Sequence, residues 1–232
     1  MFSNCFSSWF TSDFASFAET AVKDAKTFDF LLMDLGVSSF QLDDPDRGFS
    51  FRFGDALLDM RMNPEDSRDA FYILHSYSEK ELSDLFFKGE LPRSRQIAKL
   101  ICSYRNRKSI KTVEDLLQLV SPVLKKNRSF HPATLLFQAL RMEVNQELKQ
   151  LEKILELLPQ LLKENGTAAV ISFHSLEDRV VKNSFRNLKQ KQLATILTKK
   201  PLTASQQEKK HNPRSRSAKM RVIKCTTNAI QD

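Results

Sequence analysis

Two short runs of consecutive apolar residues give the clearest structural signals in the chain. One covers residues 28–35 and closes at Asp34, and the other covers residues 167–173 and closes at His174. Apolar runs of this length, bounded by polar residues, are typical of strands buried in a parallel sheet. Both segments are therefore predicted as strands, and residues 222–225 are predicted as one further strand.

Between the two strands, from about residue 67 to residue 164, the apolar positions follow a helical period. Ser78 with Glu81, and Thr112 with Asp115, have the spacing of capping boxes, which mark the first turns of helices. Several short helices in succession are therefore predicted for this part of the chain.

The segments that flank these helices are less regular. The last helix is expected over residues 134–158, where Pro159 bends or ends it, with a turn at 160–164 and a stop at Asn165-Gly166. Residues 36–66 show no period and contain six aspartates. A long irregular segment in a compact domain is usually functional or disordered.

The order of these elements predicts an α/β sheet that a helical insertion interrupts. In open α/β sheets, ligands bind beyond the carboxyl ends of the strands. We therefore expect the segments that follow Asp34 and Phe173 to share one cleft.

The composition narrows the class of protein. Of the 232 residues, 41% are hydrophobic and 28% are charged, and no uncharged apolar run approaches the ~20 residues of a membrane span. Three widely spaced cysteines, Cys5, Cys102 and Cys225, indicate neither a disulfide framework nor a metal site. No basic residue precedes Lys23, which argues against a secretory signal. We expect a protein of the reducing cytoplasm.

Positive charge is concentrated in the last quarter of the chain. Residues 179–232 hold 14 Lys and Arg against 2 Asp and Glu, a net +12, whereas the whole chain carries +8 and the first 178 residues therefore −4. Such a segment is typical of proteins that bind polyanions, although a solvated tail has the same composition. If residues 219–224 form an edge strand, Lys219 and Arg221 are expected to point outward together.

Several polar motifs follow one another in a fixed order. They are Asp34 to Ser39 (DLGVSS), Gln41 to Phe51 (QLDDPDRGFSF), Leu58 to Met62 (LDMRM), His131 to Thr134 (HPAT) with the later FQALR and VN, Ile171 to Arg179 (ISFHSLEDR), and Asn212 to Lys219 (NPRSRSAK). Together they resemble the RsmH (MraW) family of S-adenosylmethionine-dependent methyltransferases, which act on cytosine N4 of 16S ribosomal RNA. The resemblance extends from about residue 14 to residue 224.

The resemblance implies a class I (Rossmann-like) methyltransferase sheet with an inserted helical domain. It assigns residues 1–45 and 141–232 to the methyltransferase domain and residues 46–140 to the insertion. It also implies S-adenosylmethionine as the methyl donor. The implied partner is small-subunit ribosomal RNA or an assembling small ribosomal subunit, and no membrane is involved.

The resemblance further implies which residues contact the donor. These are Asp34, Gln41 and an upstream aromatic residue, for which Phe14 is the best match and Phe17 the alternative. The catalytic group is not identified. Candidate contacts to the RNA substrate are Ser38, His174, Arg214 and Arg216. His174 lies at a predicted strand end, where a structural, hydrogen-bonding histidine is an equal alternative.

One departure from the family pattern concerns the start of the sequence. Family members begin with a His-x-Pro-Val segment and a glycine-rich loop, which hold the methionine and ribose ends of the donor, and the present sequence starts downstream of both. The first strands of the sheet are therefore expected to be missing, and donor binding and methyl transfer to be impaired. The alternative function is that of a non-catalytic, RNA-binding remnant of such an enzyme.

Overall fold

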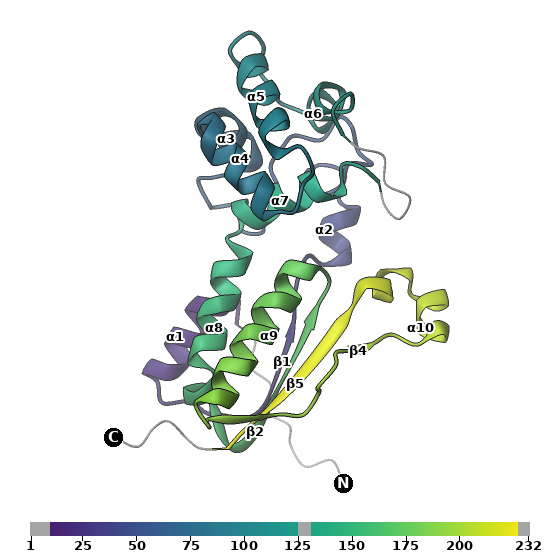
Figure 1. Cartoon of the computed structure of the whole chain (residues 1–232). Coiled ribbons are helices and arrows are strands. Elements are labelled where there is room, and N and C mark those ends of the chain that lie inside the picture. The colour runs from purple at the N-terminus through teal and green to yellow at the C-terminus, as the bar shows by residue number, and fades with distance from the viewer. Residues whose placement is uncertain (1–9, 125–130, 227–232) are drawn as a thin grey trace. The chain divides into compact units, whose positions relative to one another are not determined.

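The chain folds into two compact units, each with its own apolar core. The computed structural model describes residues 10–124 and 131–226. Unit 1 comprises Met1–Gly36 with Leu148–Asp232, and unit 2 comprises Val37–Glu147 (Figure 1). Unit 2 therefore enters the chain as an insertion into unit 1. The domain limits derived from the sequence, at residues 45 and 140, stay a prediction.

Unit 1 is built on a mixed sheet with the strand order β1-β2-β5-β3, in which β4 also pairs with β5. The strands are β1 (Phe28–Asp34), β2 (Leu162–Ser172), β3 (Ala194–Ile196), β4 (Leu202–Thr203) and β5 (Lys219–Cys225). The two strands predicted from their apolar runs, β1 and β2, are parallel neighbours. The other pairings, all made by β5, are antiparallel.

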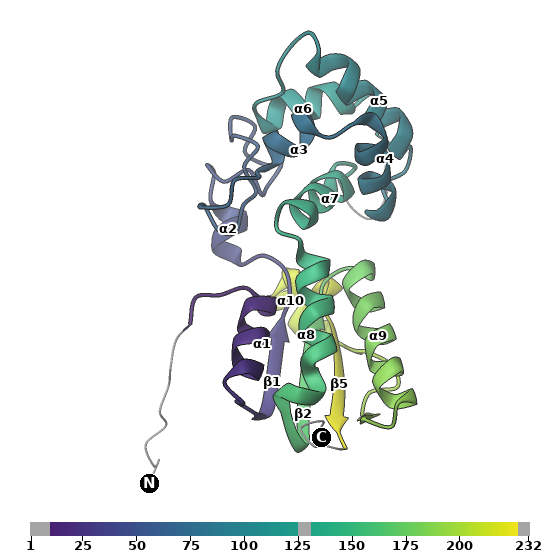
Figure 2. The ribbon, with the colours of Figure 1, turned by 90° about the vertical axis from the view of Figure 1, so that its left-hand side faces the viewer.

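Helices cover one face of this sheet. Figure 2 shows α1 (Phe14–Lys23), α8 (Glu147–Leu161) and α9 (Ser175–Gln190) side by side in front of the strands. The core between the two layers includes Ala18, Leu155 and Phe185 from the helices and Met33, Val170 and Ile223 from the strands. The unit also contains α10 (Gln206–His211) and the short 3-10 helix η1 (Pro213–Ser217).

The other face of β1 is open. Phe30 and Leu32 point away from the helices because side chains alternate along a strand, and each remains 57% exposed. In the described part of the sheet, β1 pairs only with β2, so that its outer edge is also unpaired.

Unit 2 is helical. Its helices are α2 (Ser39–Asp43), α3 (Ala70–Ser76), α4 (Glu79–Lys88), α5 (Ser94–Arg105), α6 (Val113–Val120) and α7 (Thr134–Val144). The two predicted capping boxes are confirmed, because Ser78 and Glu81 begin α4 and Thr112 and Asp115 begin α6. The core packs fully buried side chains such as Phe86, Ile97, Leu116 and Leu136.

The prediction of one helix over residues 134–158 was wrong. The structure has two helices, which Asn145 and Gln146 separate, and Gln146 adopts a left-handed conformation with φ 49°. Asn145 donates hydrogen bonds to the carbonyl oxygens of Met60 and Arg141 and accepts one from the amide of Met62. These distant contacts fix the break, and spacing along the sequence does not reveal them.

Two further expectations, about the end of α8 and about β5, were also wrong. Helix α8 continues through Pro159 to Leu161, and β2 begins at Leu162, so no turn occupies residues 160–164. Strand β5 lies between β2 and β3 rather than at an edge. Arg221 therefore does not point outward with Lys219 into solvent. It is 8% exposed and bonds Asp178 of α9 (Nε to Oδ1 2.6 Å, Nη2 to Oδ2 3.1 Å).

Other predictions concerned membranes and thiols. Across residues 10–124 and 131–226, none of the helices is long and apolar enough to cross a membrane. Cys102 is half-buried and Cys225 is buried, and Cys5 lies outside the described residues.

Candidate functional site

Three segments meet at the end of the unit 1 sheet where β1 and β2 finish and β5 starts, which we call the functional edge. Because β1 and β2 are parallel, Asp34 pairs in register with Ile171, and the amide of Leu35 donates to the carbonyl oxygen of Ile171 at 3.0 Å. The antiparallel β5 starts at this same edge, where Lys219 pairs with Ser172. The segments that follow β1 and β2, and the segment with η1 that precedes β5, therefore leave the sheet at the same end. This end was predicted for the segments after β1 and β2.

Asp34 is an exposed acidic group where β1 ends. Its residue is exposed, so that its carboxylate is available to a ligand. Partial burial, and then the negative charge of Glu177, raise the pKa of Asp34 above its ordinary value. Both effects disfavour the ionised form. A ligand group that carries positive charge or donates hydrogen bonds would relieve them.

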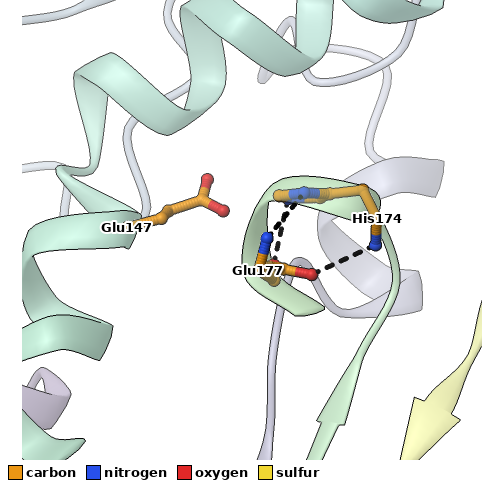
Figure 3. A group of neighbouring side chains, drawn as sticks. All are labelled: Glu147, His174 and Glu177. Atoms are coloured by element: carbon orange, nitrogen blue, oxygen red, sulfur yellow. Dashed lines mark hydrogen bonds and ion pairs between the residues drawn. The ribbon is translucent and has the colours of Figure 1, made fainter. Parts of the chain in front are cut away.

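His174 and Glu177 form the turn between β2 and α9 (Figure 3). The Nδ1 atom of His174 accepts a hydrogen bond from the Glu177 amide at 3.3 Å, and a Glu177 carboxylate oxygen accepts from the amides of Phe173 (2.8 Å) and His174 (3.3 Å). This is a capping box that begins α9, with Glu177 only 2% exposed. His174 therefore has the structural role that was one of its two alternatives.

The other ring nitrogen of His174 is placed differently. Its Nε2 atom is buried and makes no hydrogen bond within the described residues, although a Glu177 oxygen lies 3.1 Å away. Because Nδ1 accepts from the Glu177 amide, Nε2 carries the ring proton and faces this Glu177 oxygen. The second alternative for His174, a contact to substrate, stays a prediction.

Phe14, the predicted aromatic contact to the donor, is the first residue of α1. In Figure 2, α1 begins at the end of unit 1 where β1 finishes. The Phe14 ring is partly buried against the apolar core. Phe17, the alternative, is a full turn further along, and its ring lies 5.9 Å from that of Phe28 at the start of β1. Of the two, Phe14 is the residue nearer the functional edge.

Ser38 and Gln41 belong to unit 2, a few residues beyond Asp34 along the chain. They begin α2 as a capping box. The side-chain oxygen Oε1 of Gln41 accepts from the backbone N–H of Ser38 at 2.9 Å, and the Ser38 hydroxyl accepts from the backbone N–H of Gln41 at 3.2 Å. The side-chain N–H groups of Gln41 are therefore the part of this residue that suits a ligand.

Arg214 and Arg216 lie on η1, beside the strand ends of unit 1. Both are exposed, whereas Ser215 between them is buried and donates to the carbonyl oxygen of Asn212 at 2.7 Å. The 3-10 turn thus presents its basic side chains to solvent. Lys219 follows directly, with its ammonium 3.8 Å from Asp178.

Other motif residues hold unit 2 together. Arg61 bonds Asp59 through two nitrogens (2.8 and 2.9 Å) and donates to the carbonyl oxygens of Pro64 and Asp66. Asn145 ties the same loop to α7, as described above. We therefore assign the LDMRM and VN motifs to the fold of the irregular segment.

The motifs at the strand ends and in unit 2 belong to one protein family. The model of the MraW methylase family matches residues 3–226 of the chain. The chain belongs to the MraW methylase family. Its α/β architecture is that of a class I methyltransferase, so the predicted family and fold class are confirmed.

The chain is also similar to named proteins from other organisms. "Ribosomal RNA small subunit methyltransferase H" of Acaryochloris marina is 51% identical over 199 residues, which cover 84% of this chain and 64% of that protein. The protein of the same name from Acidobacterium capsulatum is 47% identical over 197 residues, covering 84% and 66%. The chain thus spans slightly under two thirds of the length of these relatives.

Sequence reasoning missed Glu177 as a member of the site. Glu177 lies three residues after His174, which is the spacing of a capping box, with histidine in place of the usual serine or threonine. This spacing is the signal in the sequence that could have identified Glu177. Only the fold shows that the buried carboxylate also acts on Asp34.

Proposed function

We propose that this member of the MraW methylase family transfers a methyl group from S-adenosylmethionine to N4 of a cytidine in small-subunit (16S) ribosomal RNA. The observation that carries the proposal is the position of Asp34 at the end of β1, beside the β2–α9 turn and the basic η1. The name of its relatives, ribosomal RNA small subunit methyltransferase H, supports methylation of small-subunit ribosomal RNA. A ribosomal RNA substrate implies a reaction in the cytoplasm.

The donor-binding residues proposed are Asp34, Gln41 and Phe14. The two oxygens of Asp34 suit hydrogen-bond donors of the ligand, the Gln41 amide N–H groups suit an acceptor, and an aromatic side chain suits an adenine ring. S-adenosylmethionine, when bound, supplies a methyl group activated by the sulfonium charge. Asp34 holds and orients the donor in this proposal and does not react.

The substrate side requires a different contact. Cytosine N4 is a weak nucleophile because its lone pair is delocalised into the ring, so that alignment and acceptance of an amino proton matter most. We propose Ser38, whose hydroxyl oxygen can accept a hydrogen bond, as a candidate for this contact. His174 is the candidate for a second contact to the base: its Nδ1 atom accepts from the Glu177 amide, so its Nε2 atom carries the ring proton and would donate to a ring acceptor of cytosine.

Methyl transfer tests the proposal directly. We expect radiolabel to pass from S-adenosylmethionine to cytidine N4 of small-subunit RNA or isolated small subunits. The assay compares the 232-residue chain with a chimera that adds the part of the Acaryochloris marina relative outside the matched region. RNA binding without transfer by either protein would overturn the proposal and favour the non-catalytic remnant.

Arg214 and Arg216 provide a second test, on the RNA side. We expect Arg214→Ala with Arg216→Ala to weaken RNA binding about equally for all sequences, because guanidinium groups at this edge contact phosphates. The slope of log affinity against log salt should fall by about two phosphate equivalents. An unchanged slope, measured by fluorescence anisotropy, would instead indicate a solvated segment.

A further inference from the structure

A second concentration of positive charge lies in unit 2, around α5. Residues 93–111 contain seven Lys and Arg and no Asp or Glu. The excess is hidden in the net charge of the first 178 residues, which is negative. Composition over long windows therefore gives no sign of it.

The fold sorts the residues of this segment onto two sides. Ile97, Ala98 and Ile101 are completely buried in the core of unit 2. Arg95 and Lys99 are exposed and four residues apart, so they lie on one face of α5, and Ser103 continues this face as a further exposed residue. Arg107, also exposed, keeps the same spacing in the turn that follows the helix. We call Arg95, Lys99 and Arg107 the basic α5 face.

Neighbouring cations already have partners within unit 2. Arg93 donates to the carbonyl oxygen of Val123 at 3.1 Å, Arg105 donates to that of Leu74 at 2.5 Å, and the Lys108 ammonium lies 3.9 Å from Asp115. Within the described residues, Lys99 and Arg107 make no hydrogen bond or ion pair. Lys99 and Arg107 are therefore available to neutralise phosphates, which releases the counterions condensed on a nucleic acid.

We propose that the basic α5 face binds the sugar-phosphate backbone of RNA. The inference rests on the proposed function, which supplies an RNA substrate, and adds a contact distinct from η1. Arg95 and Lys99 lie one turn apart on α5 and Arg107 follows in the turn after the helix, so the face offers three exposed cations to neighbouring phosphates. A protein partner would call for a large buried side chain at the centre of the contact, and the row of exposed residues on α5 is polar throughout.

The test is a double variant of the full chain, Lys99→Gln with Arg107→Gln. Glutamine keeps the helix propensity and removes the charge. Binding is measured by anisotropy with a labelled RNA hairpin of mixed sequence, without methyl donor, at several salt concentrations. The slope of log affinity against log salt should fall by about 1.8 for duplex contacts or about 1.4 for single-stranded ones, with roughly tenfold weaker binding at low salt.

Lys80→Gln with Lys88→Gln, on α4, is the matched control. It removes the same charge from the same unit. Lys80 pairs with Asp84 at 2.8 Å, and Lys88 also lowers the pKa of Asp84, so both have an acidic neighbour. We expect this variant to keep nearly all of the salt slope of the unsubstituted chain.

Two outcomes would overturn the inference. One is an equal loss of slope in both double variants, which would indicate a general charge effect. The other is unchanged RNA binding with reduced binding to polyglutamate, which would indicate an acidic protein partner. Because no donor is present, failure of methyl transfer does not affect this result.

Discussion

We expect Asp34→Ala to lower the affinity for S-adenosylmethionine by a hundredfold or more. A hydrogen bond to a charged group contributes roughly 1.5–3 kcal/mol, so losing two such bonds reaches this magnitude. Asp34 stands at the end of β1, where the sheet places its exposed carboxylate beside the β2–α9 turn. Calorimetry on the chimera described above measures the effect, and the 232-residue chain is titrated in parallel.

Asp29→Ala is the matched control for this substitution. Asp29 lies on the same strand but near its other end, where its carboxylate pairs with Lys163 at 2.8 Å. Donor affinity should not change in this variant. Normal donor affinity in Asp34→Ala as well would show that the family assignment of this residue does not apply here.

The second large effect is expected in stability. Arg221→Ala should lower the free energy of unfolding by up to about 3–5 kcal/mol, because the largely buried Asp178 carboxylate loses both of its hydrogen bonds from Arg221 and keeps only the Lys219 ammonium, 3.8 Å away. Chemical denaturation followed by circular dichroism measures the loss. Lys163→Ala, which breaks the exposed pair with Asp29, is the control and should leave the denaturation midpoint almost unchanged.

The loss in Arg221→Ala should also depend on pH. Burial alone would raise the pKa of Asp178, but the hydrogen bond and charge of Arg221, together with Lys219, outweigh it and hold this pKa below its ordinary value. The pair therefore stabilises the protein above the ordinary pKa of an aspartate, near 3.9, and this contribution is lost as pH falls through the lowered value. The difference between the two proteins should shrink in acid, and a constant difference would contradict the role of the ion pair.

Much of unit 1 was predictable because its signals are local. Apolar runs identified β1 and β2, and rules for parallel sheets placed the segments after Asp34 and Phe173 at one edge. In unit 2, the capping boxes of α4 and α6 were equally predictable, because the two partners of each box lie within one turn.

What was not predictable depends on contacts between distant parts of the sequence. The direction of Arg221 follows from the position of β5 inside the sheet, and the break after α7 follows from bonds between Asn145 and a loop more than eighty residues away. For the site, the family resemblance indicated Asp34, and its place at a predicted strand end indicated His174. The burial of Glu177 and of the His174 Nε2 atom, 3.1 Å from a Glu177 oxygen, required the fold.

The open edge and face of β1 have a consequence for the handling of this protein. Among residues 10–124 and 131–226, no strand pairs with the outer edge of β1, and such an edge is a template for pairing with other chains. The exposed Phe30 and Leu32 side chains strengthen such contacts. Self-association at high concentration should therefore start at this strand. A lysine at position 32 would act as a gatekeeper against aggregation and leave the helix-covered face untouched.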